Sequence, residues 1–218
     1  MTTTAAEPAA AASPREQRRR QRQELGRAQI LDAAEAAFSR KGFHETTVAE
    51  IAALAEFSVG AVYGFFADKD DLYAQVWLRR GAEFMDGMRA ALGSDRPPRE
   101  LMHDLADFQV AFFRDHAAFA RLFLRTAGPV IGPLGATEGT VAGNYTEAMT
   151  LQRELFRVGA AAGELRRGDP EVLASMFSGL VAAFQASDPG VAGLAVATGH
   201  RMPLTELHAI LDAAFAPG

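Results

Sequence analysis

Two short amphipathic segments joined by a tight turn are the feature that most restricts how this chain folds. Apolar residues recur at positions i, i+3, i+4 and i+7 of each segment: Val48, Ile51, Ala52 and Ala55, then Val59, Val62, Tyr63 and Phe66. This spacing predicts two helices that each bury one stripe against a shared core. Two such helices at a tight turn are typical of a helix-turn-helix, a motif that reads DNA.

Three helix-start signals restrict this region further. Thr47 followed by Glu50 has the spacing of a capping box, Ser58 can cap the second helix, and Asp68 can cap a third. The second helix carries no charge, and its outer face contains glycines, so its backbone could approach base edges or phosphates closely. Alternatively, its small residues could allow tight packing against another helix.

Three motifs lie between Arg27 and Tyr73, about a fifth of the chain: ILDAAEAAFSRKGFHETTVAEIAALA, FSVGAVYGFF and DKDDLY. This stretch resembles the N-terminal domain of the TetR family of bacterial transcriptional regulators. The resemblance implies that Thr46 and Thr47, at the start of the second family helix, and Lys69, at the start of the fourth, contact phosphate. It also implies that five residues face DNA from the third helix: Ser58, Gly60, Ala61, Tyr63 and Phe65.

Two positions depart from the family pattern. Glu56 stands where the family usually has glycine, at a turn that often needs left-handed backbone, which costs a residue other than glycine about 1–2 kcal/mol. Phe65 stands where the family often has His or Tyr, so its contact with DNA would be apolar, for example with a thymine methyl group. We therefore expect a strained turn at Glu56.

The composition restricts the class of protein. The chain has 218 residues, 49% of them apolar, which can fill a sizeable core. It has no cysteine, which excludes disulfides, thiolate metal sites and cysteine nucleophiles. The first residues lack the apolar stretch of a signal peptide, and no apolar run reaches the roughly 18 residues of a membrane helix. We expect a cytoplasmic protein without a membrane partner, metal or cofactor.

The net charge of −5 is unevenly distributed. Residues 1–69 hold nine basic and nine acidic side chains, whereas residues 70–218 account for the whole deficit. Within the first part, residues 15–27 carry six arginines against two glutamates. Such an arm can follow phosphates or enter a minor groove, and the candidate contacts are Arg18, Arg19, Arg20 and Arg22. The alternative is a solubilising tail, and both interpretations allow residues 1–26 to be disordered without DNA.

The rest of the chain predicts an all-α fold. Beyond the helix-turn-helix, apolar periodicity and capping residues predict helices over residues 26–41, 69–92, 99–114, 117–126, 140–162, 170–186 and 204–215. We divide the chain into an arm at 1–26, a DNA-binding domain at 27–72 and a ligand-binding and dimerisation domain at 73–218. The helix over 69–92 begins in one domain and ends in the next, so it can link them mechanically.

Aromatic residues gather in the second domain with a few polar ones. An apolar pocket with orienting polar groups is typical of small-molecule sites, although any buried bundle needs such residues for its core. The candidate ligand contacts are Trp77, His103, Phe108, Phe112, His116, Phe119, Phe123, Tyr145, Met149, Gln152 and Phe156.

The last two predicted helices carry apolar stripes at a period near 3.5 residues, which suits helices packed at a shallow angle. The resemblance implies that this pair meets its copy in a four-helix dimer interface; packing within one monomer is the alternative. The candidate interface residues are Met176, Phe177, Leu180, Phe184, Leu204, Leu207 and Leu211. The long apolar segment 187–203 between the helices is expected to lie against the partner or the pocket.

These features together predict a homodimeric regulator, more specifically a repressor, that binds a pseudo-palindromic DNA operator and is released by a small apolar or aromatic effector. An architectural DNA-binding dimer without an effector is the alternative. An enzyme is poorly supported, because the chain has no nucleophile elbow, no phosphate-binding glycine loop and no histidine pair at metal-ligand spacing. His103 and Asp107 form an i, i+4 pair of potential ligands, which we expect to make a solvated hydrogen bond rather than a metal site.

Overall fold

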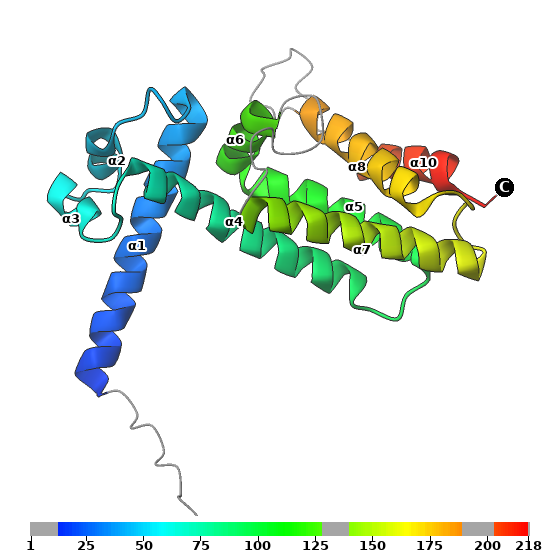
Figure 1. The fold of residues 1–218 in the computed structure, drawn as a ribbon, viewed down its shortest axis with the longest axis horizontal. Coiled ribbons are helices and arrows are strands. Elements are labelled where there is room, and N and C mark those ends of the chain that lie inside the picture. Colours follow the sequence, from blue (N-terminus) through cyan, green and yellow to red (C-terminus); the bar gives the residue numbers. More distant parts are fainter. Residues whose placement is uncertain (1–12, 128–139, 189–202, 218) are drawn as a thin grey trace, which may run out of the picture.

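The computed structural model describes residues 13–127, 140–188 and 203–217, and the regular structure in these ranges is helical (Figure 1). The prediction of an all-α fold is confirmed. The helices are α1 (Pro14–Lys41), α2 (Val48–Leu54), α3 (Val59–Tyr63), α4 (Lys69–Leu92), α5 (Pro98–Asp115), α6 (Ala117–Ala127), α7 (Thr140–Ala162), α8 (Pro170–Ser187) and α10 (Leu204–Phe215). Most of the apolar segment 187–203 lies outside the described residues, so the prediction for it stays a prediction.

The predicted capping residues hold the starts of three helices. The side-chain oxygens of Thr47, Ser58 and Asp68 accept hydrogen bonds from the backbone N–H three residues on, at 3.2, 3.1 and 2.8 Å. Glu50 does not complete the capping box; its carboxylate pairs with Lys41 on α1 at 2.8 Å instead. These local bonds fix the directions in which α2, α3 and α4 leave their turns.

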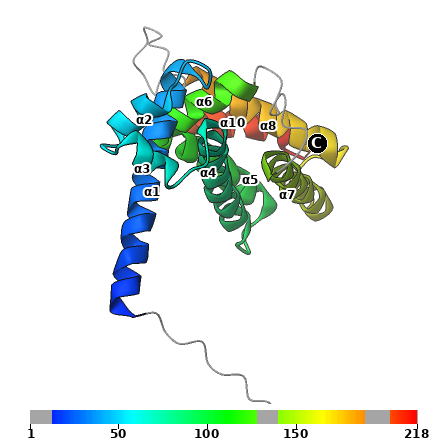
Figure 2. The ribbon, with the colours of Figure 1, turned by 60° about the vertical axis from the view of Figure 1, so that its left-hand side comes forward.

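The first helix is longer than its sequence pattern predicted. It begins at Pro14 rather than Gly26, so residues 14–26 belong to α1. A capping box explains the earlier start: Ser13 accepts from the Glu16 N–H at 3.3 Å, and its own N–H donates to the Glu16 carboxylate at 2.8 Å. Figures 1 and 2 show the first part of α1, in dark blue, extending well beyond the other helices.

The helix-turn-helix closes over one buried cluster. Ile30, Leu31 and Phe38 of α1 pack with residues of α2, α3 and α4. The predicted stripe of α3 is only partly correct, because Val62 and Phe66 are buried whereas Val59 and Tyr63 are exposed. Since α3 is little more than one turn long and lies at the surface, it buries Val62 and leaves Val59, Gly60 and Tyr63 exposed.

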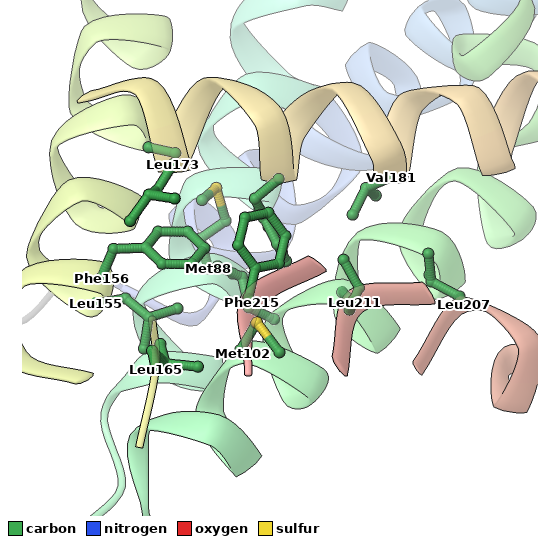
Figure 3. Close-up of a cluster of buried hydrophobic side chains, with 14 of the residues drawn as sticks. Met88, Met102, Leu155, Phe156, Leu165, Leu173, Val181, Leu207, Leu211 and Phe215 are labelled. Carbon is green, nitrogen blue, oxygen red and sulfur yellow. The ribbon is translucent and has the colours of Figure 1, made fainter. Parts of the chain in front are cut away.

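A second cluster fills the bundle formed by the later helices (Figure 3). Phe156, Phe177 and Phe215 lie at its centre, with ring centroids 4.9–6.4 Å apart. Figure 3 shows Leu173 and Val181 covering this cluster from α8. The cluster joins α4, α5, α7, α8 and α10 into one body.

Helix α4 connects the two clusters. It packs against α1 at its beginning and against α5 and α7 further along (Figures 1 and 2). Leu72 and Val76 belong to the first cluster, and Met85 and Met88 belong to the second. The prediction that this helix links the DNA-binding part to the rest of the chain therefore agrees with its packing.

Gly87 of α4 allows the ring of Phe108 on α5 to approach closely, because an added Cβ atom would overlap that ring. We expect Gly87→Ala to lower the free energy of unfolding by about 1–2 kcal/mol, since overpacking outweighs the helix propensity gained. Gly143→Ala on α7 is the matched control: nothing lies within 4 Å of its added Cβ. Urea denaturation should show that variant equal to or slightly more stable than the wild type; equal stability for both variants would contradict the close packing.

Candidate nucleic-acid interface and ligand cavity

The surface of α3 is open to a large partner. Ser58, Gly60 and Tyr63 are exposed, and nothing lies within 4 Å of a Cβ atom built at Gly60. Ala61 is half-buried beside them. The structure therefore brings these four predicted DNA contacts together on one short, uncharged helix.

Phe65 is less available than predicted. Its ring is half-buried and meets Phe57 edge to face, with centroids 6.3 Å apart. Both rings lie against Gly26 of α1, where an added Cβ atom would be 3.3 Å from each. Phe65 therefore packs the turn after α3 onto α1 in this conformation.

Two of the three predicted phosphate contacts brace the turn between α1 and α2. Thr46 is 1% exposed, and its hydroxyl donates to the Gly42 carbonyl at 2.7 Å. The Lys69 ammonium donates to the carbonyls of Phe43 and Thr46 at 2.9 and 3.1 Å. Thr47 remains on the surface. The side chains of Thr46 and Lys69 thus already donate hydrogen bonds to backbone carbonyls, an arrangement that residue spacing alone could not reveal.

The turn between α2 and α3 has the left-handed backbone predicted for it. Glu56 has a φ of 60° and is the one residue other than glycine with positive φ in the described ranges. Such backbone costs an L-residue about 1–2 kcal/mol. The sequence departure at this position therefore corresponds to a strained residue beside the candidate DNA surface.

We expect Glu56→Gly to raise the free energy of unfolding by up to about 1 kcal/mol, because the relief of strain exceeds the entropy cost of glycine. Loss of the negative charge should also raise DNA affinity. Glu56→Ala is the matched control, since it removes the charge and keeps the strain. Thermal denaturation should separate the two variants; equal melting temperatures would contradict the strain.

Four arginines form one stripe on the exposed part of α1. Arg15, Arg18, Arg19 and Arg22 lie at i, i+3, i+4 and i+7, and all four are exposed. Arg20 is also exposed but lies on another side of the helix. The predicted arm is therefore a helix with one basic face.

Charged residues join α1 to α4 further along α1, nearer its C-terminal end. The Glu35 carboxylate is buried and accepts hydrogen bonds from Arg79 at 3.1 Å and Arg80 at 2.7 Å. Burial lowers the pKa of Arg80, but the hydrogen bonds and negative charges of Glu35 and Glu83 together raise it above its ordinary value. His116 lies nearby, and burial and the positive charge of Arg80 lower its pKa. The junction therefore depends on one buried carboxylate between two guanidinium groups.

A row of aromatic rings leads from the helix-turn-helix into the bundle. The ring centroids of Phe38 and Tyr73 are 5.0 Å apart, those of Tyr73 and Trp77 are 6.2 Å apart, and those of Trp77 and Phe119 are 5.2 Å apart. The buried cluster of the helix-turn-helix therefore continues without interruption to α6.

A cavity of about 150 Å³ lies at the end of this row, among α4, α5, α6, α7 and α8. Six of the predicted ligand contacts line it: Trp77, Phe119, Phe123, Tyr145, Met149 and Gln152. Further lining residues that the sequence analysis missed include Phe84, Gln109, Phe113, Asn144, Ser178 and Gln185. A polar residue at a buried helix position, such as Gln109 or Gln185, was the signal that could have revealed them.

The other predicted ligand contacts lie elsewhere. Phe108 and Phe112 pack beside Phe84 but do not line the cavity, and Phe156 is wholly buried in the second cluster. His116 belongs to the charged junction described above. Long-range packing sets which faces of α5 and α7 meet the cavity, so the sequence pattern alone could not identify which of these residues line it.

His103 also lies outside the cavity, in a contact between α5 and α10. Its ring stacks on His208 with centroids 4.3 Å apart. His103 bonds to Asp212 at 2.9 Å and His208 bonds to Asp107 at 2.7 Å, so the predicted pairing of His103 with Asp107 is wrong. A hydrogen bond from Arg99 is the main cause that lowers the pKa of Asp212. Among the described residues, no group of three or more such side chains has the geometry to hold a metal ion.

The predicted dimer residues divide into two groups. Phe177, Phe184, Leu207 and Leu211 are buried inside the monomer, so they cannot form a surface. Leu180 and Leu204 are half-buried, and Met176 is 47% exposed. Val172 on α8 and Ile210 on α10 are further exposed apolar residues. The outer faces of α8 and α10 therefore expose large apolar side chains to solvent.

These features define a helix-turn-helix protein with a separate helical bundle. The family model for bacterial regulatory proteins of the tetR family matches residues 30–76. The regulator AcrR of Shigella flexneri is 40% identical over 57 residues, 26% of each chain, so this match spans well under two thirds of AcrR. The uncharacterized regulator YhgD of Bacillus subtilis is 24% identical over 66% of this chain and 74% of its own.

Solved structures share the fold. A TetR-like transcriptional regulator from Rhodococcus sp. RHA1 has a TM-score of 0.68 at 24% identity, covering 86% of this chain and 92% of its own. Residues 30–76 therefore form a helix-turn-helix of the tetR-family type, and the described helices share the fold of this solved structure. In the described ranges, no helix combines the length and hydrophobicity needed to span a membrane.

Proposed function

We propose that the chain is a dimeric repressor whose affinity for operator DNA falls when a small effector fills the cavity among α4–α8. The observation that carries this proposal is the unbroken row from Phe38 through Tyr73 and Trp77 to Phe119. One end of the row packs the helix-turn-helix and the other end lines the cavity. A change in how the cavity is filled therefore acts on residues that position α3.

DNA reading is divided between two surfaces in this proposal. The exposed, uncharged face of α3, with Ser58, Gly60 and Tyr63, selects base edges in the major groove. The arginine stripe of α1 contacts phosphates and supplies affinity that does not depend on sequence. Thr47 adds a phosphate contact at the start of α2.

The effector acts through its different affinity for two arrangements of the DNA-binding heads. A ligand that prefers the arrangement with misplaced heads lowers operator affinity, and a coupling of about 1–3 kcal/mol corresponds to a change of some 5- to 150-fold. Residues that line the cavity should then alter the response to effector more than the binding of DNA without it.

The dimer places two copies of α3 in successive major grooves, with half-sites roughly 34–36 Å apart. The outer faces of α8 and α10 support this assembly, since Met176 and Ile210 are exposed apolar residues there. We expect Met176→Glu to raise the dimer dissociation constant at least about tenfold, because the carboxylate would lose its hydration. Sedimentation measures this; Val158→Glu, at an exposed position on α7, is the control. A dimer unchanged by Met176→Glu would contradict this interface.

Selection of bound sequences from a random DNA pool tests the proposed function. We expect an inverted repeat whose half-sites are about one helical turn apart. Enrichment without a common sequence would favour the alternative, an architectural DNA-binding dimer without an effector. Enrichment of a single half-site would contradict two-fold binding.

A further inference from the structure

We propose that the cavity selects an uncharged molecule with one aromatic ring and an oxygen that accepts hydrogen bonds from Trp77 and Gln109. This inference rests on the proposed function only in treating the cavity as a ligand site. It goes further because it assigns the chemical class of the ligand.

The charge of the cavity lining restricts which ligands can bind. Every described residue that lines the cavity is uncharged, and Glu35, Arg79 and Arg80 of the nearby junction are not among them. An ionised ligand entering this site would lose its hydration without gaining a counter-charge, which strongly disfavours binding. The lining therefore selects neutral molecules.

The size and shape of the cavity restrict the ligand further. A cavity of about 150 Å³ is similar in volume to engineered apolar cavities that bind benzene. Aromatic side chains form much of the wall, and the ring centroids of Trp77 and Phe119, and of Phe113 and Phe123, are 5.2 Å apart in each pair. Aromatic rings interact favourably edge to face or offset, so this wall suits a single aromatic ring.

Two residues of the cavity wall carry buried hydrogen-bond donors without a partner in the described part of the protein. The indole N–H of Trp77 and the side-chain amide nitrogen of Gln109 are buried and have no hydrogen-bond partner in the described part of the protein. Two other polar side chains of the wall already have partners: Ser178 donates to the Gln152 side-chain oxygen at 2.6 Å, and Gln185 donates to the backbone carbonyl of Gln109 at 3.0 Å. Both unmatched groups donate, and an indole N–H can only donate.

An oxygen acceptor on the ligand therefore satisfies donors that the protein leaves unpaired. Buried donors without partners destabilise a protein, so a ligand that pairs with them gains more than a hydrocarbon of the same shape. A carbonyl or ether oxygen is the group that provides this without adding charge. The uncharged lining, the cavity volume and the two donors together favour an aromatic ketone, aldehyde, ester or ether of about one ring.

Three probes of similar shape test the assignment with the full chain: acetophenone, ethylbenzene, which lacks the oxygen, and benzoate, which is charged. Calorimetry should show acetophenone binding at least about tenfold more tightly than ethylbenzene, a difference of about 1.4 kcal/mol, with benzoate weakest. Trp77 is the single tryptophan in the sequence, so one indole N–H signal in a proton–nitrogen NMR spectrum reports on this donor. Acetophenone should shift that signal in the direction of hydrogen bonding, and ethylbenzene should not.

Trp77→Phe keeps an aromatic wall and removes the donor, so acetophenone should lose its advantage over ethylbenzene. Tyr73→Phe is the matched control, because it also removes one polar hydrogen from an aromatic ring, but from a ring that does not line the cavity, and it should keep the advantage. Equal binding of acetophenone and ethylbenzene to the wild type, strongest binding of benzoate, or no binding of acetophenone would each overturn the assignment.

Operator binding, measured separately, distinguishes this inference from the proposed function. If acetophenone binds as expected and operator affinity is unchanged, the ligand class stands and the proposed regulation by the cavity fails. If a charged compound releases the operator and acetophenone does not bind, the regulation stands and the ligand class fails.

Discussion

Replacement of Glu35 by alanine should lower the free energy of unfolding by about 3–5 kcal/mol, because it leaves two guanidinium groups without their buried counter-charge. The Glu35 side chain is 5% exposed and lies 3.1 Å from Arg79 and 2.7 Å from Arg80. Both arginines belong to α4, so the loss falls on the contact between α1 and α4. Urea denaturation of the purified protein measures the effect.

Asp32→Ala provides the matched control. Asp32 also pairs with Arg79, at 2.8 Å, but its side chain is 63% exposed. Exposed ion pairs contribute about 0–1 kcal/mol, so this variant should be nearly as stable as the wild type. If both variants lose a similarly small free energy of unfolding, the ion pairs of Glu35 with Arg79 and Arg80 are not buried in solution.

Replacement of the stripe Arg15, Arg18, Arg19 and Arg22 by glutamine should weaken binding to all DNA sequences similarly. The slope of log affinity against log salt should fall by about 0.9 for each arginine that contacts phosphate, up to about 3.6 for one arm. Between 50 and 200 mM salt, the variant would then lose on the order of 100-fold less affinity than the wild type. Fluorescence anisotropy with labelled duplexes measures these slopes.

Lysine at the same four positions is the control for this experiment, because it keeps the charge and has similar helix propensity. That variant should retain the wild-type slope. Circular dichroism should show that both variants keep the helix. An unchanged slope in the glutamine variant would identify the stripe as a solubilising surface rather than a phosphate contact.

Local signals made most of the helix boundaries predictable. Thr47, Ser58 and Asp68 cap their helices through bonds that span only three residues, so their spacing in the sequence was sufficient. The start of α1 was missed although Ser13 and Glu16 form a capping box of the same kind. The composition of residues 1–26, rich in alanine and arginine, had suggested disorder and outweighed that signal.

The site depends on packing that the sequence could not specify. Phe112 and Phe113 are neighbours on α5, yet only Phe113 lines the cavity, because the contacts of α5 with α4 and α8 set its rotation. His103 was assigned to the pocket, but α10 brings His208 and Asp212 to it instead. Contacts between residues about a hundred positions apart leave no local pattern.

In the proposed regulation, occupancy of the cavity lowers the affinity for DNA. The most direct test is operator affinity measured with and without a neutral aromatic compound that saturates the indole N–H shift of Trp77. We expect operator affinity to fall about 5- to 150-fold, and DNA should weaken binding of the compound by the same factor. A compound that fills the cavity while operator affinity stays constant would contradict it.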